Sequence, residues 1–247
     1  MPETQTTVDG LRAVELSFRP LRDIATGRSV CYLARTQLNT PGLGTLMPET
    51  FRPAAELSGK SAELFSLELL QLAESIRTLD ESDRQFQWVS QDMPLSIIRD
   101  RAALAKIEET CEQFSLSHGK LCFAVPEETL DEKDDRAAKN IALMRKLGFH
   151  VMLTGFGESG CPFIQLSELI VDYVMLSPSL TFHLGKGERS DRAVHSLITF
   201  INDLESEPVA DGVKTSSQAE TLYSFGCNYC AGHLSGEYIS LSGLTSF

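Results

Sequence analysis

The sequence predicts an α/β fold, a closed TIM-like (β/α)8 barrel that opens with a β-hairpin, so that one strand runs antiparallel to the others. Short apolar segments alternate with amphipathic helical patterns, which favours parallel strands joined by crossover helices. The number of expected strands is close to eight. The chain has 247 residues, and a single-domain barrel of this kind takes about 250.

Two segments of β-like composition open the fold. They are "AVELSFRPL" (13–21) and "RSVCYLARTQL" (28–38), joined by "RDIATG". Gly27 in that connection supplies the positive φ of a hairpin turn. We therefore expect one barrel domain over residues 13–247, preceded by a flexible N-terminus over residues 1–12.

The later elements follow from apolar spacing. Leucines recur at three- and four-residue steps from about residue 54 to 79, which predicts a helix. Helices over 131–148 and 190–206 each carry an apolar face, and Gly148 stands where the first one needs a C-terminal cap. Further strands are expected at 86–91, 120–125, 149–154, 171–176, 207–211 and 227–232, with a helix at 217–225.

Composition excludes several classes of function. The formal net charge is −12, and the chain has no block of Lys and Arg, so it lacks the electrostatic footprint of a protein that binds nucleic acid or an anionic membrane. No apolar run approaches the roughly 18 residues of a membrane span, and the N-terminus is polar and acidic, unlike a signal peptide. We expect a cytoplasmic protein.

Three motifs look like chemistry but have simpler interpretations. "CNYC" (227–230) has C-x-x-C spacing, yet a zinc site needs a second pair of ligands and only His233 follows, so two buried structural thiols are favoured over metal ligation. "GKGERSD" (185–191) lacks the spacing of a phosphate-binding loop and is expected to be a solvated loop. The acidic run at 127–135 is expected to begin the helix that follows it.

Four stretches in order carry a resemblance to a known family. They are "FRPLRDIATGRSV" (18–30), "LMPETFRPAAE" (46–56), "KLGFHVMLTGFGESG" (146–160) and "VADGVKTSSQAETLYSFGCNYCAG" (209–232). Together they resemble the EAL domain family, bacterial phosphodiesterases that linearise cyclic di-GMP, over about residues 14–240. The resemblance implies the EAL type of barrel, with two divalent cations held by oxygen ligands at the carboxyl ends of its strands.

The positions that match the family's metal-binding and catalytic residues have changed in this chain. Leu33 replaces the Glu of E-A-L, Met175 replaces the Lys of K-I-D, and Lys214 reverses the sign of a Glu. Only Asp211 keeps a carboxylate, on a shorter side chain. The complete set of these vestigial positions is Leu33, Gln91 (or Ser90 in a shifted register), Ala124, Thr154, Gly155, Met175 with Ser177, Asp211, Lys214 and Ala231.

We therefore predict a protein that is not an enzyme, binds no metal or cofactor, and regulates bacterial signalling by binding another protein. The alternative is a metal-independent cyclic di-GMP receptor, in which Arg19, Pro20 and Arg35 contact the nucleotide. Against that alternative, Gln37, Gly155 and Ala231 replace an Arg, an Asp and a Gln with which the family contacts the nucleotide.

Two further possibilities stay open. Residual phosphodiesterase activity requires a rebuilt site from Asp211 with Glu127, Glu128 and Glu158, which nothing in their spacing supports. Family members also pair through the region after the DDFG turn, so the resemblance implies a homodimer through residues 158–169.

Overall fold

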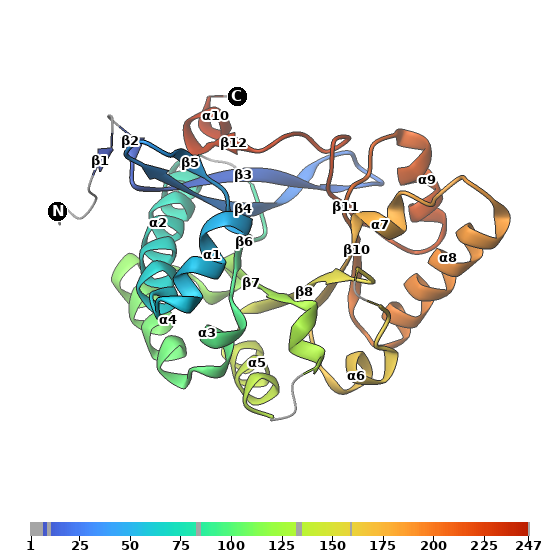
Figure 1. The fold of residues 1–247 in the computed structure, drawn as a ribbon. Helices are drawn as coiled ribbons and strands as arrows, with labels where there is room; N and C mark the ends of the chain where they lie inside the picture. The colour runs from blue at the N-terminus through green and yellow to red at the C-terminus, as the bar shows by residue number, and fades with distance from the viewer. Residues whose placement is uncertain (1–6, 9–10, 83–84, 132–134, 159, 247) are drawn as a thin grey trace.

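Eight strands close into a barrel in the computed structural model, which describes residues 7–8, 11–82, 85–131, 135–158 and 160–246 (Figure 1). Neighbouring strands are parallel, except that β3 is antiparallel to both β4 and β11. The predicted barrel with an opening hairpin and one antiparallel strand is therefore confirmed. In order around the wall the strands are β3 (Val14–Asp23), β4 (Ser29–Thr40), β6 (Val89–Asp92), β7 (Leu121–Pro126), β8 (His150–Phe156), β9 (Tyr173–Leu176), β10 (Glu207–Ala210) and β11 (Tyr229–Cys230).

Short strands extend this sheet. β5 (Gly44–Leu46) pairs with β4, and β12 (Ile239–Ser240) returns from the C-terminus to pair with β3. β1 (Thr7–Val8) and β2 (Leu11–Arg12) form a separate antiparallel pair within the stretch predicted to be a flexible N-terminus. The rest of that stretch, residues 1–6 and 9–10, lies outside the described residues.

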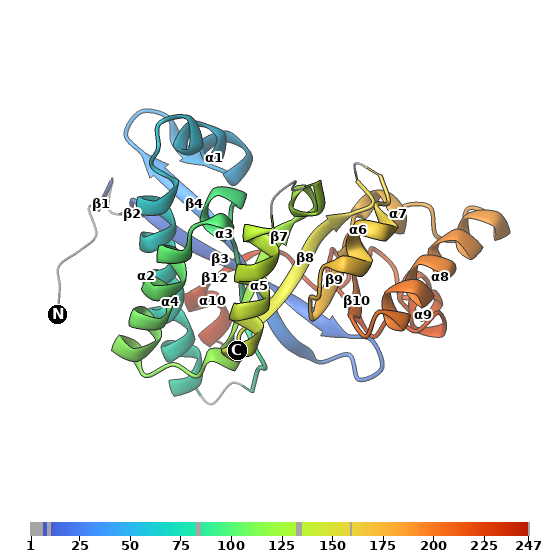
Figure 2. The ribbon, with the colours of Figure 1, turned by 90° about the horizontal axis from the view of Figure 1, so that it is seen from below.

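Helices surround the barrel (Figure 2). Among the described residues, no helix has the length and hydropathy of a membrane span. Gly148 has φ +94° after α5, as expected of a cap. The bounds are α1 (Pro48–Leu57), α2 (Ser61–Glu81), α3 (Leu95–Arg99), α4 (Arg101–Phe114), α5 (Arg136–Lys146), α6 (Phe163–Glu168), α7 (Pro178–Thr181), α8 (Glu188–Asp203), α9 (Ser216–Ser224) and α10 (Leu241–Thr245), with 3-10 turns at His118–Lys120 and Glu127–Asp131.

Several helix predictions were wrong. The single helix expected over 54–79 is two helices, because Gly59 takes φ +68° between them and ends the first. The pair α3 and α4 was not predicted. The first part of the acidic run at 127–135 is a 3-10 turn and not the start of α5, although Asp135 is the N-cap residue of that helix. Residues 132–134 of the run lie outside the described residues. The second half of the loop expected at 185–191 belongs to α8.

The core has two parts. An outer layer lies between the strands and the helices. An inner cluster fills the lumen of the barrel, and Trp88 is its largest member, fully buried. Cys227 and Cys230 are buried free thiols of the outer layer, and burial raises the pKa of Cys227 to about 12. Both cysteines of the C-x-x-C motif are thus buried, as its structural interpretation expects. The lumen cluster comprises Leu21, Cys31, Leu33, Trp88, Cys122, Ala124, Met152, Met175, Val209 and Ala231.

Candidate functional site at the barrel mouth

The carboxyl ends of the parallel strands form the mouth of the barrel, where active sites of this fold are built. Four of the vestigial positions meet there. Leu33 on β4, Ala124 on β7, Met175 on β9 and Ala231 after β11 all belong to the buried lumen cluster. These four apolar side chains close the upper lumen, and none of them presents an oxygen atom to a ligand.

Thr154 and Gly155 end β8. The Thr154 hydroxyl donates to the carbonyl of Val125 at 3.1 Å, so it is already engaged with the neighbouring strand. Gly155 takes φ +76°, and a Cβ built on it would lie 3.6 Å from Oε2 of Glu158, which folds back over the turn. Glu127 accepts a hydrogen bond from the Gly157 backbone at 3.0 Å. The turn after β8 is thus held by Glu127 of the 3-10 turn that follows β7.

The β6 prediction needs a correction at Gln91, whereas its shifted-register alternative, Ser90, pairs with the lumen residue Leu33. Gln91 points away from the lumen, because its amide donates to Glu68 of α2 at 3.5 Å. Trp88 fills the lumen, and since side chains alternate along a strand, Ser90 and Asp92 share its side. Asp92 lines a cavity of about 270 Å³ at the mouth. It is the acidic residue that the sequence analysis missed, and alternation counted from Trp88 would have found it.

Asp92 belongs to a network that joins α1 to the barrel. Nη2 of Arg52 lies 3.2 Å from Oε1 of Glu68 and 3.5 Å from Oδ2 of Asp92. Glu68 is fully buried, whereas about half of the Asp92 side chain is exposed. One guanidinium thus offsets two carboxylates, and it ties the position of α1 to the mouth.

This network predicts a pH dependence. Burial raises the pKa of Glu68 above its usual 4.5, and this effect is larger than the lowering of the pKa by the positive charge of Arg52. The folded protein therefore binds more protons than the unfolded chain as the pH rises from 4.5 through the raised pKa, and stability falls over that window. We expect the free energy of unfolding of the wild type to decrease relative to that of Glu68→Gln as the pH rises, measured by urea denaturation from about pH 4 to pH 7.

Glu63 offers a matched control on the same helix. It is exposed, and the hydrogen bond and charge of Lys60 lower its pKa. The stabilisation that Glu63 contributes is present above pH 4.5 and is lost as the pH falls through the lowered pKa. The free energy of unfolding of the wild type should therefore increase relative to that of Glu63→Gln as the pH rises. A wild-type curve parallel to that of Glu68→Gln would contradict the prediction.

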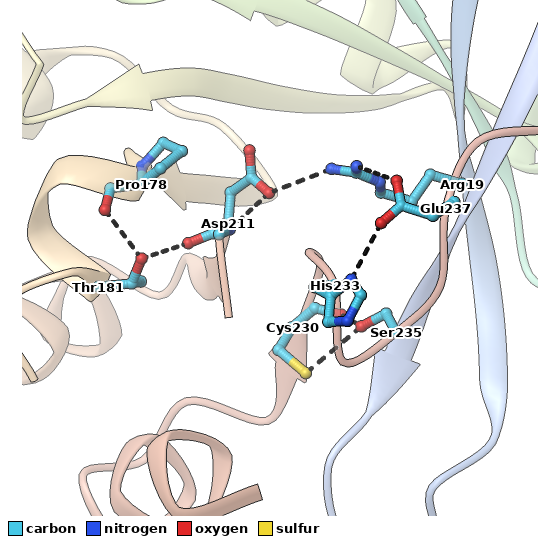
Figure 3. Close-up of polar contacts among 9 residues, drawn as sticks. Arg19, Pro178, Thr181, Asp211, Cys230, His233, Ser235 and Glu237 are labelled. Carbon is cyan, nitrogen blue, oxygen red and sulfur yellow. Dashed lines mark hydrogen bonds and ion pairs between the residues drawn. The ribbon is translucent and has the colours of Figure 1, made fainter. Parts of the chain in front are cut away.

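A second group of charges lies across the mouth (Figure 3). Arg19 of β3 reaches toward Asp211 at 3.9 Å and toward Glu237 at 3.5 Å, and Glu237 also contacts His233 at 3.1 Å. Asp211 is fixed by its backbone, since its carbonyl accepts from the Thr181 hydroxyl at 2.6 Å. Asp211, the vestigial position that keeps a carboxylate, therefore has a cation partner from the protein itself.

The two predicted arginine contacts come together beneath a C-terminal strap, residues 232–240. The guanidiniums of Arg19 and Arg35 lie 4.5 Å and 3.8 Å from the centre of the Tyr238 ring. Their Nε atoms are buried and have no acceptor among the described atoms. Pro20 faces the opposite side of β3, where its ring lies beside Gly236 of the same strap.

Other predicted residues do not join this site. Lys214 is exposed at the start of α9, where its backbone N–H donates to Gln218. Across the part of the chain that the structure describes, no three His, Cys, Asp or Glu side chains are grouped so that they could hold a metal ion. Asp211, Glu127, Glu128 and Glu158 therefore do not form a rebuilt metal site in the described structure.

A scan of family models matches residues 6–238 to the EAL domain. The chain belongs to the EAL domain family. A curated relative, the cyclic di-GMP phosphodiesterase NbdA of Pseudomonas aeruginosa, is 23% identical over 234 residues, which are 95% of this chain and 30% of that protein. The chain therefore spans less than a third of NbdA.

Solved EAL domains share the fold. The EAL enzyme Bd1971, determined with cAMP and cyclic di-GMP bound, matches at a TM-score of 0.86 and 18% identity over 94% of this chain and 64% of that one. PaMucR phosphodiesterase, determined as a cyclic di-GMP complex, matches at 0.85 and 19% identity over 94% of both chains. These likenesses place the barrel mouth of this EAL domain in a known architecture.

Proposed function

We propose that this EAL domain does not hydrolyse cyclic di-GMP and regulates signalling by binding another protein. The observation that carries the proposal is the apolar mouth, where Leu33, Ala124 and Met175 are buried together. A pair of divalent cations needs several charged oxygen ligands, both to bind and to offset the repulsion between the two ions. The apolar side chains at these three positions supply no oxygen ligand.

The remaining carboxylates support the same proposal. Asp92 is paired with Arg52 and Asp211 with Arg19. A cation at either carboxylate has to compete with a guanidinium that the protein already holds nearby. Even changes around the ligands of a metal site cost about 10 to 100-fold in affinity or activity, and here the ligands themselves have changed.

Incubation of the purified protein with cyclic di-GMP and Mg²⁺ or Mn²⁺ tests the loss of hydrolysis. We expect no linear dinucleotide above a protein-free control, by chromatography, at high protein concentration. Linear product that disappears with EDTA would contradict the proposal. An active EAL phosphodiesterase assayed in the same buffer shows that the conditions support the reaction.

A metal-independent cyclic di-GMP receptor is the second candidate. Two structural neighbours are described with this nucleotide bound. In this chain, the guanidiniums of Arg19 and Arg35 both stack on the Tyr238 ring at the mouth and bring two positive charges together there, which favours an anionic ligand. Calorimetry without metal separates the candidates: heat that Arg35→Ala abolishes and Lys214→Ala preserves supports the receptor, and no heat removes it.

Self-association through residues 158–169 stays a prediction. Phe163 and Ile164 on α6 are exposed apolar side chains in that range. Sedimentation of the protein over a range of concentrations measures whether a dimer forms.

A further inference from the structure

A groove leads away from the barrel mouth under α1. Its outer part, the α1 groove, has a volume of about 390 Å³ and is lined by Pro53, Ala55, Glu56, Leu64, Leu95 and Glu128, among others. Arg52, Pro94 and Pro126 line both this groove and the cavity of about 270 Å³ at the mouth. The two hollows therefore adjoin, and together they run from the barrel mouth to the outside of α1.

The walls of the α1 groove are apolar and rigid. Proline rings at 53, 94 and 126 fix the backbone φ on three sides. Leu64 and Leu95 lie partly exposed at its surface. Arg52 holds α1 against the buried Glu68, and Phe51 anchors the same helix in the core. A ligand that enters such a preformed groove loses little binding energy to ordering of the protein.

The charge around the groove is negative. Glu128 is exposed at its edge, and Asp92 is half exposed at the end that meets the mouth. Arg52 is the only Lys or Arg among the described residues that line either hollow, and it is already paired with Glu68 and Asp92. An anionic ligand is repelled here, whereas a cationic one is complementary.

We propose that the α1 groove binds a short segment of a partner protein that combines an apolar side chain with a neighbouring Lys or Arg. The apolar side chain packs between Pro53, Leu64 and Leu95, and the cation lies beside Glu128. This inference rests on the proposed function, because it names the surface and the chemistry of the partner that the domain docks onto. A nucleotide does not fit the same surface, since its phosphates would face Glu128 and Asp92.

Selection of a phage-displayed library of random dodecapeptides on the immobilised protein tests the proposal. We expect the enriched peptides to carry Lys or Arg next to a large apolar residue. A fluorescent synthetic copy should lose about tenfold or more in affinity for Glu128→Lys, because a like charge now faces its cation. Leu95→Ala should weaken binding as well, since it removes the apolar wall.

A matched control keeps the result specific. Glu220→Lys on α9 makes the same change in net charge at an exposed site remote in sequence from the groove, and it should leave affinity within about twofold of the wild type. Circular dichroism and urea denaturation verify that each variant is folded.

Three outcomes would overturn the inference: no enrichment, enrichment of acidic peptides, or peptides that bind Glu128→Lys and Leu95→Ala as tightly as the wild type. The third outcome would mean that the protein still binds peptides but at a surface other than the α1 groove. Hydrolysis of cyclic di-GMP in the separate assay rejects the proposed function itself, so the two failures are distinguishable.

Discussion

Replacing Trp88 with alanine is expected to lower the free energy of unfolding by about 3–5 kcal/mol. Trp88 is fully buried in the lumen, where its indole ring lies edge-on to Tyr173 with centroids 5.1 Å apart. Its Nε1–H donates to the Tyr173 hydroxyl at 3.0 Å. The truncation leaves a cavity into which the closed barrel relaxes only partly, and it also removes a partly buried hydrogen bond. Urea denaturation followed by far-UV circular dichroism measures the loss.

Trp88→Phe is the matched control for this prediction. It keeps an aromatic ring in the lumen and removes only part of the volume and the hydrogen bond, so it should cost less than Trp88→Ala. Circular dichroism is the suitable probe because Trp88 is the only tryptophan in the chain, so its replacement also removes the tryptophan fluorescence that would otherwise report unfolding. A loss below about 1 kcal/mol for Trp88→Ala would show that the lumen repacks freely, contrary to the close packing of protein cores.

Replacing Gly232 with alanine is expected to lower the free energy of unfolding by a similar amount, about 3–5 kcal/mol. Gly232 begins the C-terminal strap and takes φ +127°. A Cβ at this position would lie 2.5 Å from the Val213 nitrogen and 2.6 Å from the Val213 oxygen. Because both are backbone atoms, the strap must move away from the loop after β10. That movement also separates Val213 from Ala231, whose backbone groups are hydrogen-bonded at 3.0 Å.

Gly42→Ala separates this clash from the strain of a positive φ. Gly42 takes φ +81°, but a Cβ there would meet nothing within 4 Å. It should therefore cost only about 1 kcal/mol, from backbone strain alone. Equal losses for the two variants, measured by urea denaturation, would mean that the close approach of the strap contributes nothing to stability.

The strap also explains why the arginines could not be understood from the sequence. In the alternative prediction of a nucleotide receptor, Arg19 was a contact because it matches a ligand-contacting position of the EAL family, and Arg35 because its guanidinium suits a phosphate. The structure places Tyr238 against both of them and Glu237 beside Arg19. These partners come from the other end of the chain, and only the pairing of β12 with β3 brings them to the mouth.

Local pattern was sufficient for the architecture, whereas the character of the mouth also required the resemblance to the EAL family. Alternating apolar strands and amphipathic helices, with Gly27 in the hairpin, predict the barrel because each element buries its own apolar face. The resemblance to the EAL family assigned Leu33, Ala124 and Met175 to the mouth, and their apolar side chains predicted its character. In the structure all three belong to the buried lumen cluster.

Other features were decided by the tertiary structure alone. Whether Gln91 or Asp92 faces the mouth depends on where β6 enters the barrel wall, because a shift of one residue turns every side chain to the other face. The pairing of Arg52 with Glu68 and the α1 groove require two helices that a single predicted helix had merged. The sequence by itself determined which side chains are available, and folding determined which of them meet, because contacts between distant segments depend on strand order and register.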